Sequence, residues 1–225
     1  MNSNIDKSLF QFLTELNENN NRDWFNDNKT KFQKIQGQFK IVFNQLLTQM
    51  KVHDDIENLK IFRIYRDVRF SKNKLPYKTH MSAALHRRKP QLRGGYYVHL
   101  APNNESFIAV GFWDPNKDDL FRIRKELEMD ASEFKSIIHQ TELKKLWGNL
   151  EGESLKTAPR DFDKEHPDIE LIRMKQFIFT KTFTDQEVMH EDFIHTVNQS
   201  FKAIRPFFDL MSDVLTTNLN GEPLI

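Results

Sequence analysis

The residues best suited to chemistry in this sequence lie in one basic segment, between Lys60 and Arg93. The segment holds eleven basic residues and one acid, Asp67, so its formal charge is +10. The rest of the 225-residue chain, with 22 basic and 31 acidic residues, carries −9. The basic residues are Lys60, Arg63, Arg66, Arg69, Lys72, Lys74, Lys78, Arg87, Arg88, Lys89 and Arg93. Such segregation indicates either a surface for an anionic partner or a cationic patch that the protein's own acids cover.

Six of these cations and one tyrosine are candidates for binding an anionic small molecule. Arginine binds phosphate or carboxylate at two points, and lysine adds movable charge. The candidates are Arg63, Arg66, Arg69, Lys72, Lys74, Lys78 and Tyr97. In the alternative interpretation the cations are paired within the protein: Asp67 holds Arg66 or Arg69, and the others meet distant acids such as Glu126, Asp185 or Glu191. Both interpretations stay open.

Catalysis is conceivable in one form, with Asp67 or His99 transferring a proton beside cations that hold the substrate. The substrate would be a phosphorylated or carboxylated small molecule. The sequence contains no Gly-rich phosphate loop, Rossmann fingerprint or Gly-x-Ser-x-Gly elbow, which disfavours the common nucleotide-binding and hydrolase families. Whether the protein is an enzyme is therefore open, beside a binding module and a purely structural scaffold.

Nucleic acid is a further possible partner, because the basic residues alternate with aromatic ones that could stack on bases. The aromatic residues are Tyr65, Phe70, Tyr77, Tyr96 and Tyr97. A net charge of only +1 and the absence of a known nucleic-acid motif argue against this partner. The cluster Arg87-Arg88-Lys89 is expected to be solvated in a loop.

Neither a metal nor a cofactor is predicted. The chain has no cysteine, which excludes disulfides and thiolate metal sites. His190 and His195 are five residues apart and point about 140° away from each other on a helix, so they lack the zinc-protease spacing. The acids around His53 lack the glycine and spacing of a calcium loop.

The cationic candidates are expected on a strand over residues 59–70 and on the loop that follows. In that strand Phe62, Ile64, Val68 and Phe70 would share one face and Arg63, Tyr65, Asp67 and Arg69 the other. Arg66 would fall on the apolar face, where an arginine needs a carboxylate or a bound anion. A short apolar piece at residues 81–85 is taken as helical.

Other patterns predict a short helix from Asp6, a long one from Asn21 to about Met50, and a hairpin over residues 94–101 and 105–113. Short helices are expected at 120–127, 131–139, 142–148 and 169–174, a loop at 152–166 and a strand at 176–183. The last helical run, 193–215, should be kinked or split by Pro206.

These elements predict an α+β fold, with a central, largely antiparallel sheet of about four or more strands and helices grouped at both ends. No shift in composition divides residues 1–225, so one domain is expected. The longest apolar stretch has seven residues, whereas a membrane span needs roughly 20. Because the N-terminal residues also lack the pattern of a secretory signal, we expect a cytoplasmic protein without membrane contact. The oligomeric state is not indicated.

One stretch resembles a known family signature. Arg66-Asp67-Val68-Arg69-Phe70-Ser71 is followed by Lys74-Leu75-Pro76-Tyr77-Lys78. This is similar to the Arg-Asp-x-Arg-Phe-Ser and Lys-x-Pro-Tyr-Lys signature of a broadly distributed microbial family of conserved uncharacterised proteins, a domain of unknown function. The resemblance extends over residues 6–219 and implies no reaction, substrate or cofactor. The sequence departs from the family at Asn73-Lys74-Leu75, where Asp-Lys-Thr is expected, and at Asp161, where glycine is expected.

Overall fold

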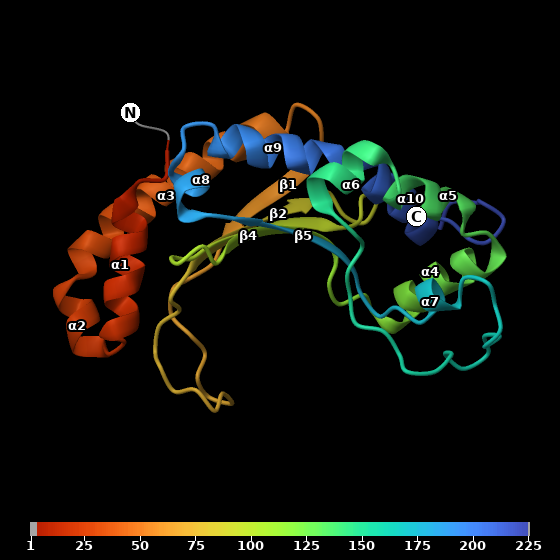
Figure 1. The fold of residues 1–225 in the computed structure, drawn as a ribbon, viewed down its shortest axis with the longest axis horizontal. Coiled ribbons are helices and arrows are strands. Elements are labelled where there is room, and N and C mark those ends of the chain that lie inside the picture. Colours follow the sequence, from red (N-terminus) through yellow and green to blue (C-terminus); the bar gives the residue numbers. More distant parts are fainter. Residues whose placement is uncertain (1–3, 225) are drawn as a thin grey trace. The chain divides into compact units, whose positions relative to one another are not determined.

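The computed structural model describes residues 4–224 and contains one antiparallel sheet flanked by helices (Figure 1). The sheet has five strands in the order β1-β2-β3-β4-β5, so each strand pairs with its neighbour in sequence. Their bounds are Ile56–Ile61, Met81–Arg87, Gly95–Leu100, Ser106–Phe112 and Phe177–Phe183. The prediction of an α+β fold with an antiparallel sheet is therefore confirmed.

The described chain divides into two compact units, and their boundaries fall within β2, β3, β4 and β5. Unit 1 comprises residues 4–85, 97–108 and 182–199, and unit 2 comprises residues 86–96, 109–181 and 200–224. Each unit thus contains part of the sheet strands. This division does not test whether the units fold separately, and the single domain stays a prediction.

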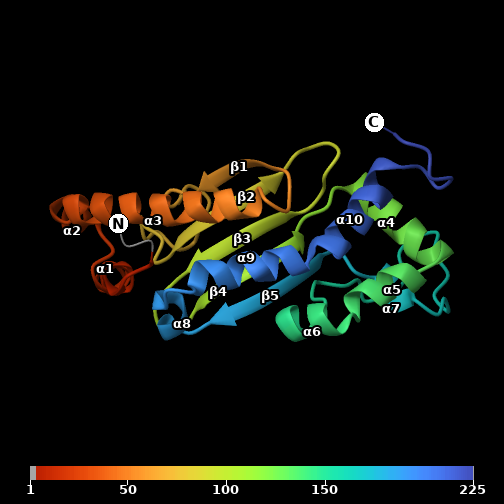
Figure 2. The same cartoon turned by 90° about the horizontal axis from the view of Figure 1, so that it is seen from above.

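Unit 1 begins with α1 (Lys7–Glu18), α2 (Arg22–Asp27) and α3 (Lys29–Met50). Asn21 caps α2 by accepting a hydrogen bond from the Trp24 amide at 3.0 Å. The apolar side chains of α3 are buried, and α3 packs beside β1 (Figure 2). Helix α8 (Asp185–Met189) and the first part of α9 (Phe193–Ala203) complete the unit.

In unit 1, α3 and α9 lie on one side of the strands, and the loop of residues 62–80 extends on the other (Figure 1). Side chains alternate accordingly. Val98 and Leu100 are buried, whereas Tyr97, His99 and Phe107 are only half-buried. The second set forms a sheet face that the helices of this unit leave partly accessible.

Unit 2 contains α4 (Lys117–Met129), α5 (Ser132–Ile138), α6 (Thr141–Trp147), α7 (Ile169–Ile172) and α10 (Arg205–Thr216). Helix α10 packs against α4 and α5. Its second residue is Pro206, so the predicted split of the last helical run is confirmed. Strands β4 and β5 approach closely at Gly111, where a Cβ atom would lie 2.1 Å from the Phe177 carbonyl oxygen.

Two predictions around the basic segment are wrong. Residues 59–70 do not form one strand, because β1 ends at Ile61 and the chain continues as the loop of residues 62–80. Residues 81–85 are not helical but begin β2, where all five are buried. A continuous apolar run of this length is compatible with either a helix or a strand. Here the run is apolar because both faces of β2 are buried.

No helix among residues 4–224 combines the length and the apolarity needed to cross a membrane.

Candidate functional site

The candidate site of unit 1 is built on the loop of residues 62–80. The two ends of the loop pair through an antiparallel bridge between Tyr65 and Tyr77. The Arg66 amide donates to the Pro76 carbonyl at 2.8 Å, and the Lys78 amide donates to the Ile64 carbonyl at 2.8 Å. We call this paired part, residues 64–66 and 76–78, the loop base. It fixes the backbone from which Arg66 and Lys78 project.

Two residues, one in the turn between α1 and α2 and one in α2, hold the loop base in place. The Asn20 amide group donates to the Tyr77 carbonyl at 3.1 Å, and its oxygen accepts from the Tyr77 amide at 3.1 Å. Phe25 of α2 stacks on the Tyr77 ring with centroids 4.1 Å apart. Tyr77 is consequently buried, and the loop base is attached to the helices by both polar and aromatic contacts.

A cavity of about 530 Å³ lies beside the loop base. Its polar lining includes Asn20, Arg66, Asp67, Lys78, Thr79 and His80. This volume falls in the range of small-molecule sites, which is about 300–1,000 Å³.

Three of the predicted site residues therefore come together at the cavity: Arg66, Lys78 and Asp67. Arg63, Arg69, Lys72, Lys74 and Tyr97 are outside its lining within the described chain. Arg69 instead binds Asp67 through two side-chain hydrogen bonds, of 2.6 and 3.0 Å. Lys74 donates to the Val68 carbonyl at 2.9 Å. The internal pairing considered for Asp67 is thus formed with Arg69, at the protein surface.

Two of the three distant acids considered as partners of the cations, Glu126 and Asp185, bind other groups. Glu126 forms an ion pair with Arg122 at 2.8 Å. Asp185 accepts hydrogen bonds from the amides of Asn103 and Asn104 in the turn between β3 and β4. Among residues 4–224, no carboxylate forms an ion pair with Arg66 or Lys78. Arg66 and Lys78 therefore line the cavity without a direct ion pair to a described carboxylate, and the one acid of the lining, Asp67, is paired with Arg69.

The electrostatics of the cavity reflect this excess of positive charge. Burial lowers the pKa of the Lys78 ammonium, and the nearby charges of Arg63 and Arg66 lower it further. By contrast, the hydrogen bonds from Arg69 lower the pKa of the Asp67 carboxyl. Asp67 thus stays ionised, but its charge is offset by Arg69.

A row of rings continues from the cavity along the accessible sheet face of unit 1. The imidazoles of His80 and His99 lie 4.0 Å apart between centroids, and His99 stacks on Phe107 at 4.6 Å. The Tyr97 hydroxyl lies 3.3 Å from Nδ1 of His99. Burial lowers the pKa of His80 and of His99 from 6.5 to about 4, and the Lys78 charge acts in the same direction. Both imidazoles are neutral at pH 7.

Sequence reasoning missed His80, Thr79 and Asn20. His80 stands two residues after Lys78 and directly before an apolar run, a position that places it at the start of a strand beside the cationic loop. That signal would have been visible had residues 81–85 been assigned to a strand. Asn20 gave no such signal, since its partner Tyr77 is 57 residues away.

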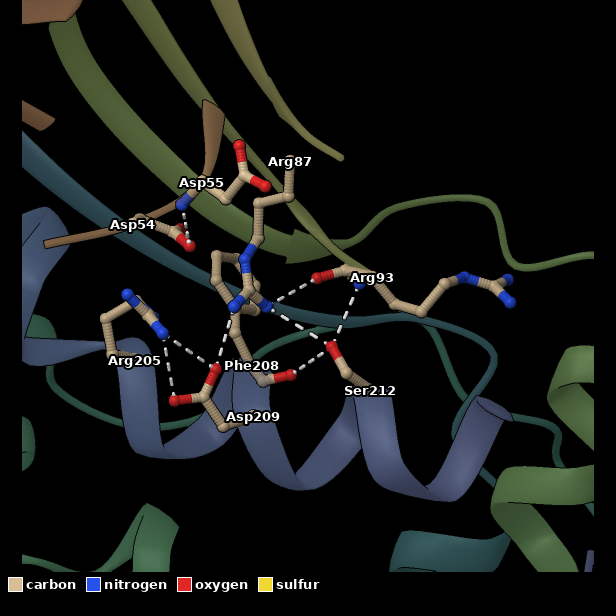
Figure 3. Close-up of polar contacts among 8 residues, drawn as sticks. All are labelled: Asp54, Asp55, Arg87, Arg93, Arg205, Phe208, Asp209 and Ser212. Carbon is tan, nitrogen blue, oxygen red and sulfur yellow. Dashed lines mark hydrogen bonds and ion pairs between the residues drawn. The ribbon is translucent and has the colours of Figure 1, made fainter. Parts of the chain in front are cut away.

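The second basic cluster has a structural role in unit 2, and the expectation that it is solvated is wrong for Arg87. Arg87 is in β2 and fully buried. Its guanidinium donates to Asp209 at 2.7 Å, to the Arg93 carbonyl at 3.0 Å and to the Ser212 hydroxyl at 3.3 Å (Figure 3). It also lies over the Phe208 ring, 5.3 Å from the centroid. Contacts with α10 therefore satisfy this arginine inside the protein.

The fold and the site define an α+β protein whose antiparallel sheet carries a loop with a cationic cavity at its base. A family model described as conserved hypothetical protein (DUF2461) matches residues 8–210, and the chain belongs to this family. The match agrees with the resemblance noted over residues 6–219. Neither the curated proteins nor the solved structures gave a match to the chain.

Proposed function

We propose that this protein binds an anionic ligand, bearing phosphate or carboxylate, in the cavity at the loop base. The observation that carries the proposal is the pair Arg66 and Lys78, which line the cavity and form no ion pair with a carboxylate of residues 4–224. Two cations that are partly removed from water are costly unless an anion joins them. A ligand anion would supply the missing charge.

The geometry favours a small ligand over a polymer. Arg66 and Lys78 line a cavity, whereas a nucleic-acid backbone would favour a flat stripe of cations. Two of the five aromatic residues considered for base stacking, Tyr77 and Tyr96, are buried. Nucleic acid is therefore the less supported partner. The absence of a cofactor and the cytoplasmic location remain predictions from the sequence.

An enzyme acting on such a ligand is the second candidate, and the neutral imidazoles support it. A neutral imidazole can accept a proton, and His80 lines the cavity beside His99. Asp67 is less suited, because Arg69 occupies its carboxylate. In this case His99→Gln would abolish turnover while leaving phosphate binding intact. Turnover that survives the substitution would exclude His99.

Isothermal titration calorimetry tests the proposed binding directly. Inorganic phosphate, a sugar phosphate and a dicarboxylate are titrated into the protein at low salt and again at high salt. Since a hydrogen bond to a charged group is worth about 1.5–3 kcal/mol, Arg66→Ala or Lys78→Ala should weaken binding at least about tenfold.

The same loop supplies matched controls. Lys72→Ala and Lys74→Ala remove equal charge from exposed residues outside the cavity lining, and binding should change less than about threefold, as expected for exposed charges. Absence of any binding, or equal losses in all four variants, would overturn the cavity as the anion site.

A further inference from the structure

The cavity is larger than a single inorganic anion needs. Its volume of about 530 Å³ is that of a site for an organic molecule of moderate size. Besides Arg66, Lys78 and the Asp67 carboxylate, which is paired with Arg69, uncharged polar groups line it, including Asn17 and Thr79. These groups suit the hydroxyl groups of a sugar more than a second charge. The lining therefore fits an anion attached to a polar organic body.

One wall of the cavity is aromatic. His80 lines the cavity, and its ring packs against His99, which in turn stacks on Phe107. The planes are inclined by 30° and 16°, with centroid separations of 4.0 and 4.6 Å, so the three rings form one continuous stack. Among the described residues, His99 is the one ring that packs against His80, and His80 lines the cavity.

Further rings and cations lie next to this wall. Phe62 is half-buried and makes an edge contact with Tyr97 at 6.0 Å. The ammonium groups of Lys60 and Lys78 lie 5.0 and 5.5 Å from the Phe62 centroid. Aromatic faces and cations thus occur together around Lys78. Such a combination recognises molecules that carry both a planar ring and a negative charge.

We propose that the ligand of this cavity is a nucleotide, a phosphate ester whose base stacks on His80 while its phosphate binds Arg66 and Lys78. The inference rests on the proposed anion site and names its ligand class. A base would extend the stack of Phe107, His99 and His80 by one ring. The neutral state of both imidazoles at pH 7 suits stacking, because no charge on the rings has to be desolvated.

Calorimetry with a graded set of ligands tests the class. AMP, UMP, ribose 5-phosphate, inorganic phosphate and adenosine are titrated at pH 7.5. Stacking of a base on an aromatic side chain contributes enough to change affinity about 5- to 150-fold. AMP should therefore bind at least about fivefold more tightly than ribose 5-phosphate. Adenosine, which lacks the phosphate, should bind more weakly than AMP.

Three variants assign the stacking to His80. His80→Leu should reduce the affinity for AMP toward that for ribose 5-phosphate and leave ribose 5-phosphate itself unchanged. His80→Phe keeps a ring and should retain the preference for AMP. His139→Leu is the matched control, since His139 is exposed in unit 2 and outside the cavity lining. Thermal unfolding of each variant shows that it is folded.

The outcomes distinguish a failure of the nucleotide proposal from a failure of the anion site. Equal binding of ribose 5-phosphate and AMP would overturn the nucleotide and leave the anion site standing. Binding of carboxylates without phosphates would do the same. An unchanged AMP preference in His80→Leu would overturn the stacking on His80. If no anion binds at all, the anion site fails and the nucleotide fails with it. The comparison of AMP with ribose 5-phosphate uses the wild-type protein and needs no variant to fold.

Discussion

In unit 1, Arg66 and Lys78 line a cavity, and no carboxylate of residues 4–224 forms an ion pair with them. In unit 2, Arg87 donates to Asp209 and Arg93 pairs with Asp119, so the protein itself supplies the counter-charges. The four cations Arg66, Lys78, Arg87 and Arg93 come from the same basic segment of the sequence. Internal pairing describes Arg87 and Arg93, whereas an anion site is our proposal for Arg66 and Lys78.

The difference shows that a count of charges does not reveal which cations are available to a ligand. Arg87 is fully buried and stabilises contacts between β2 and α10. Burial lowers the pKa of Lys78, and the charges of Arg63 and Arg66 lower it further. A buried, satisfied arginine belongs to the fold, whereas cations held close together without direct ion pairs are typical of a binding site. The following predictions test this contrast.

The largest effect is expected from Arg87→Ala. The substitution removes a buried guanidinium with hydrogen bonds to Asp209, Ser212 and a carbonyl, so the free energy of unfolding should fall by about 3–5 kcal/mol. Urea denaturation measures it. Lys202→Ala, an exposed change on α9, serves as control and should stay within about 0.5 kcal/mol. A loss below 1 kcal/mol in Arg87→Ala would contradict its structural role.

The second effect is a dependence of stability on pH that comes from unit 1. His80 and His99 have pKa values of about 4 in the folded protein and 6.5 when unfolded. Between these values the unfolded chain binds more protons, so stability is full above pH 6.5 and is lost as the pH falls toward 4. Discounted for solvent screening, the loss is on the order of 2 kcal/mol.

Denaturation at several pH values checks this prediction. Because carboxyl groups also titrate near pH 4, the informative quantity is the difference between the wild type and His80→Gln. The variant should lose less stability between pH 7 and pH 4.5. Parallel curves for the two proteins would show that His80 is not held neutral by its surroundings.

A smaller loss is expected when the loop base is loosened. Asn20→Ala removes both hydrogen bonds to Tyr77, so the free energy of unfolding should fall by about 1–2 kcal/mol. Anion binding should weaken as well, because Arg66 and Lys78 project from the loop base. Asn44→Ala is the control, because it removes only the hydrogen bond from the exposed Asn44 side chain to the Lys40 carbonyl of α3. Neither the free energy of unfolding nor anion binding should fall. Unaltered anion binding in Asn20→Ala would show that Asn20 does not position Arg66 and Lys78 for the ligand.

The smallest change in stability is expected for Lys78→Met. This substitution keeps an apolar stem of similar length and removes a charge that the neighbouring cations disfavour. Without ligand, stability should be equal to the wild type or higher, within about 1 kcal/mol. The same denaturation assay applies. A loss comparable with that of Arg87→Ala would mean that both parts of the basic segment serve the fold, and the contrast would disappear.

The sequence predicted best those elements whose signals are local. The hairpin is one example, with β3 and β4 joined by a turn at Asn103 and Asn104. Both asparagines have positive φ, 67° and 62°, a conformation that this residue type adopts more readily than most. The split at Pro206 is another, because proline cannot continue the hydrogen bonding of α9. In each case neighbouring residues determine the structure.

Elements that depend on distant partners were not predictable. The alternation over residues 59–70 resembles a strand, but Ile64 and Tyr77 are buried because the loop closes on itself and on Asn20. Arg87 was expected to be solvated, because its partner Asp209 is 122 residues away in the sequence and no local pattern indicates the pairing. For the site, Arg66 was singled out because it would fall on the apolar face of a strand that does not form, and its role stays a prediction. His80, which lines the same cavity, became recognisable only from the fold.

The turn at Asp161 has a backbone conformation that favours glycine, with a φ of 68°. Glycine adopts this left-handed region without strain, and aspartate is among the residues that tolerate it best. Asp161 is therefore compatible with the turn. The stretch Asn73-Lys74-Leu75 lies in the loop beyond its base, where the Asn73 side chain accepts a hydrogen bond from the Leu75 amide at 2.9 Å.

The loop base fixes the two ends of the loop independently of the segment between them. The bridge between Tyr65 and Tyr77, held by Asn20 and Phe25, closes residues 67–75 into a segment whose two ends are already fixed. The entropy of closing such a segment changes only slowly with its length. Insertions or deletions there would leave Arg66 and Lys78 in register. During evolution, residues 68–72 of this segment, which are outside the cavity lining, could change in length and sequence while the lining residues on either side keep their places.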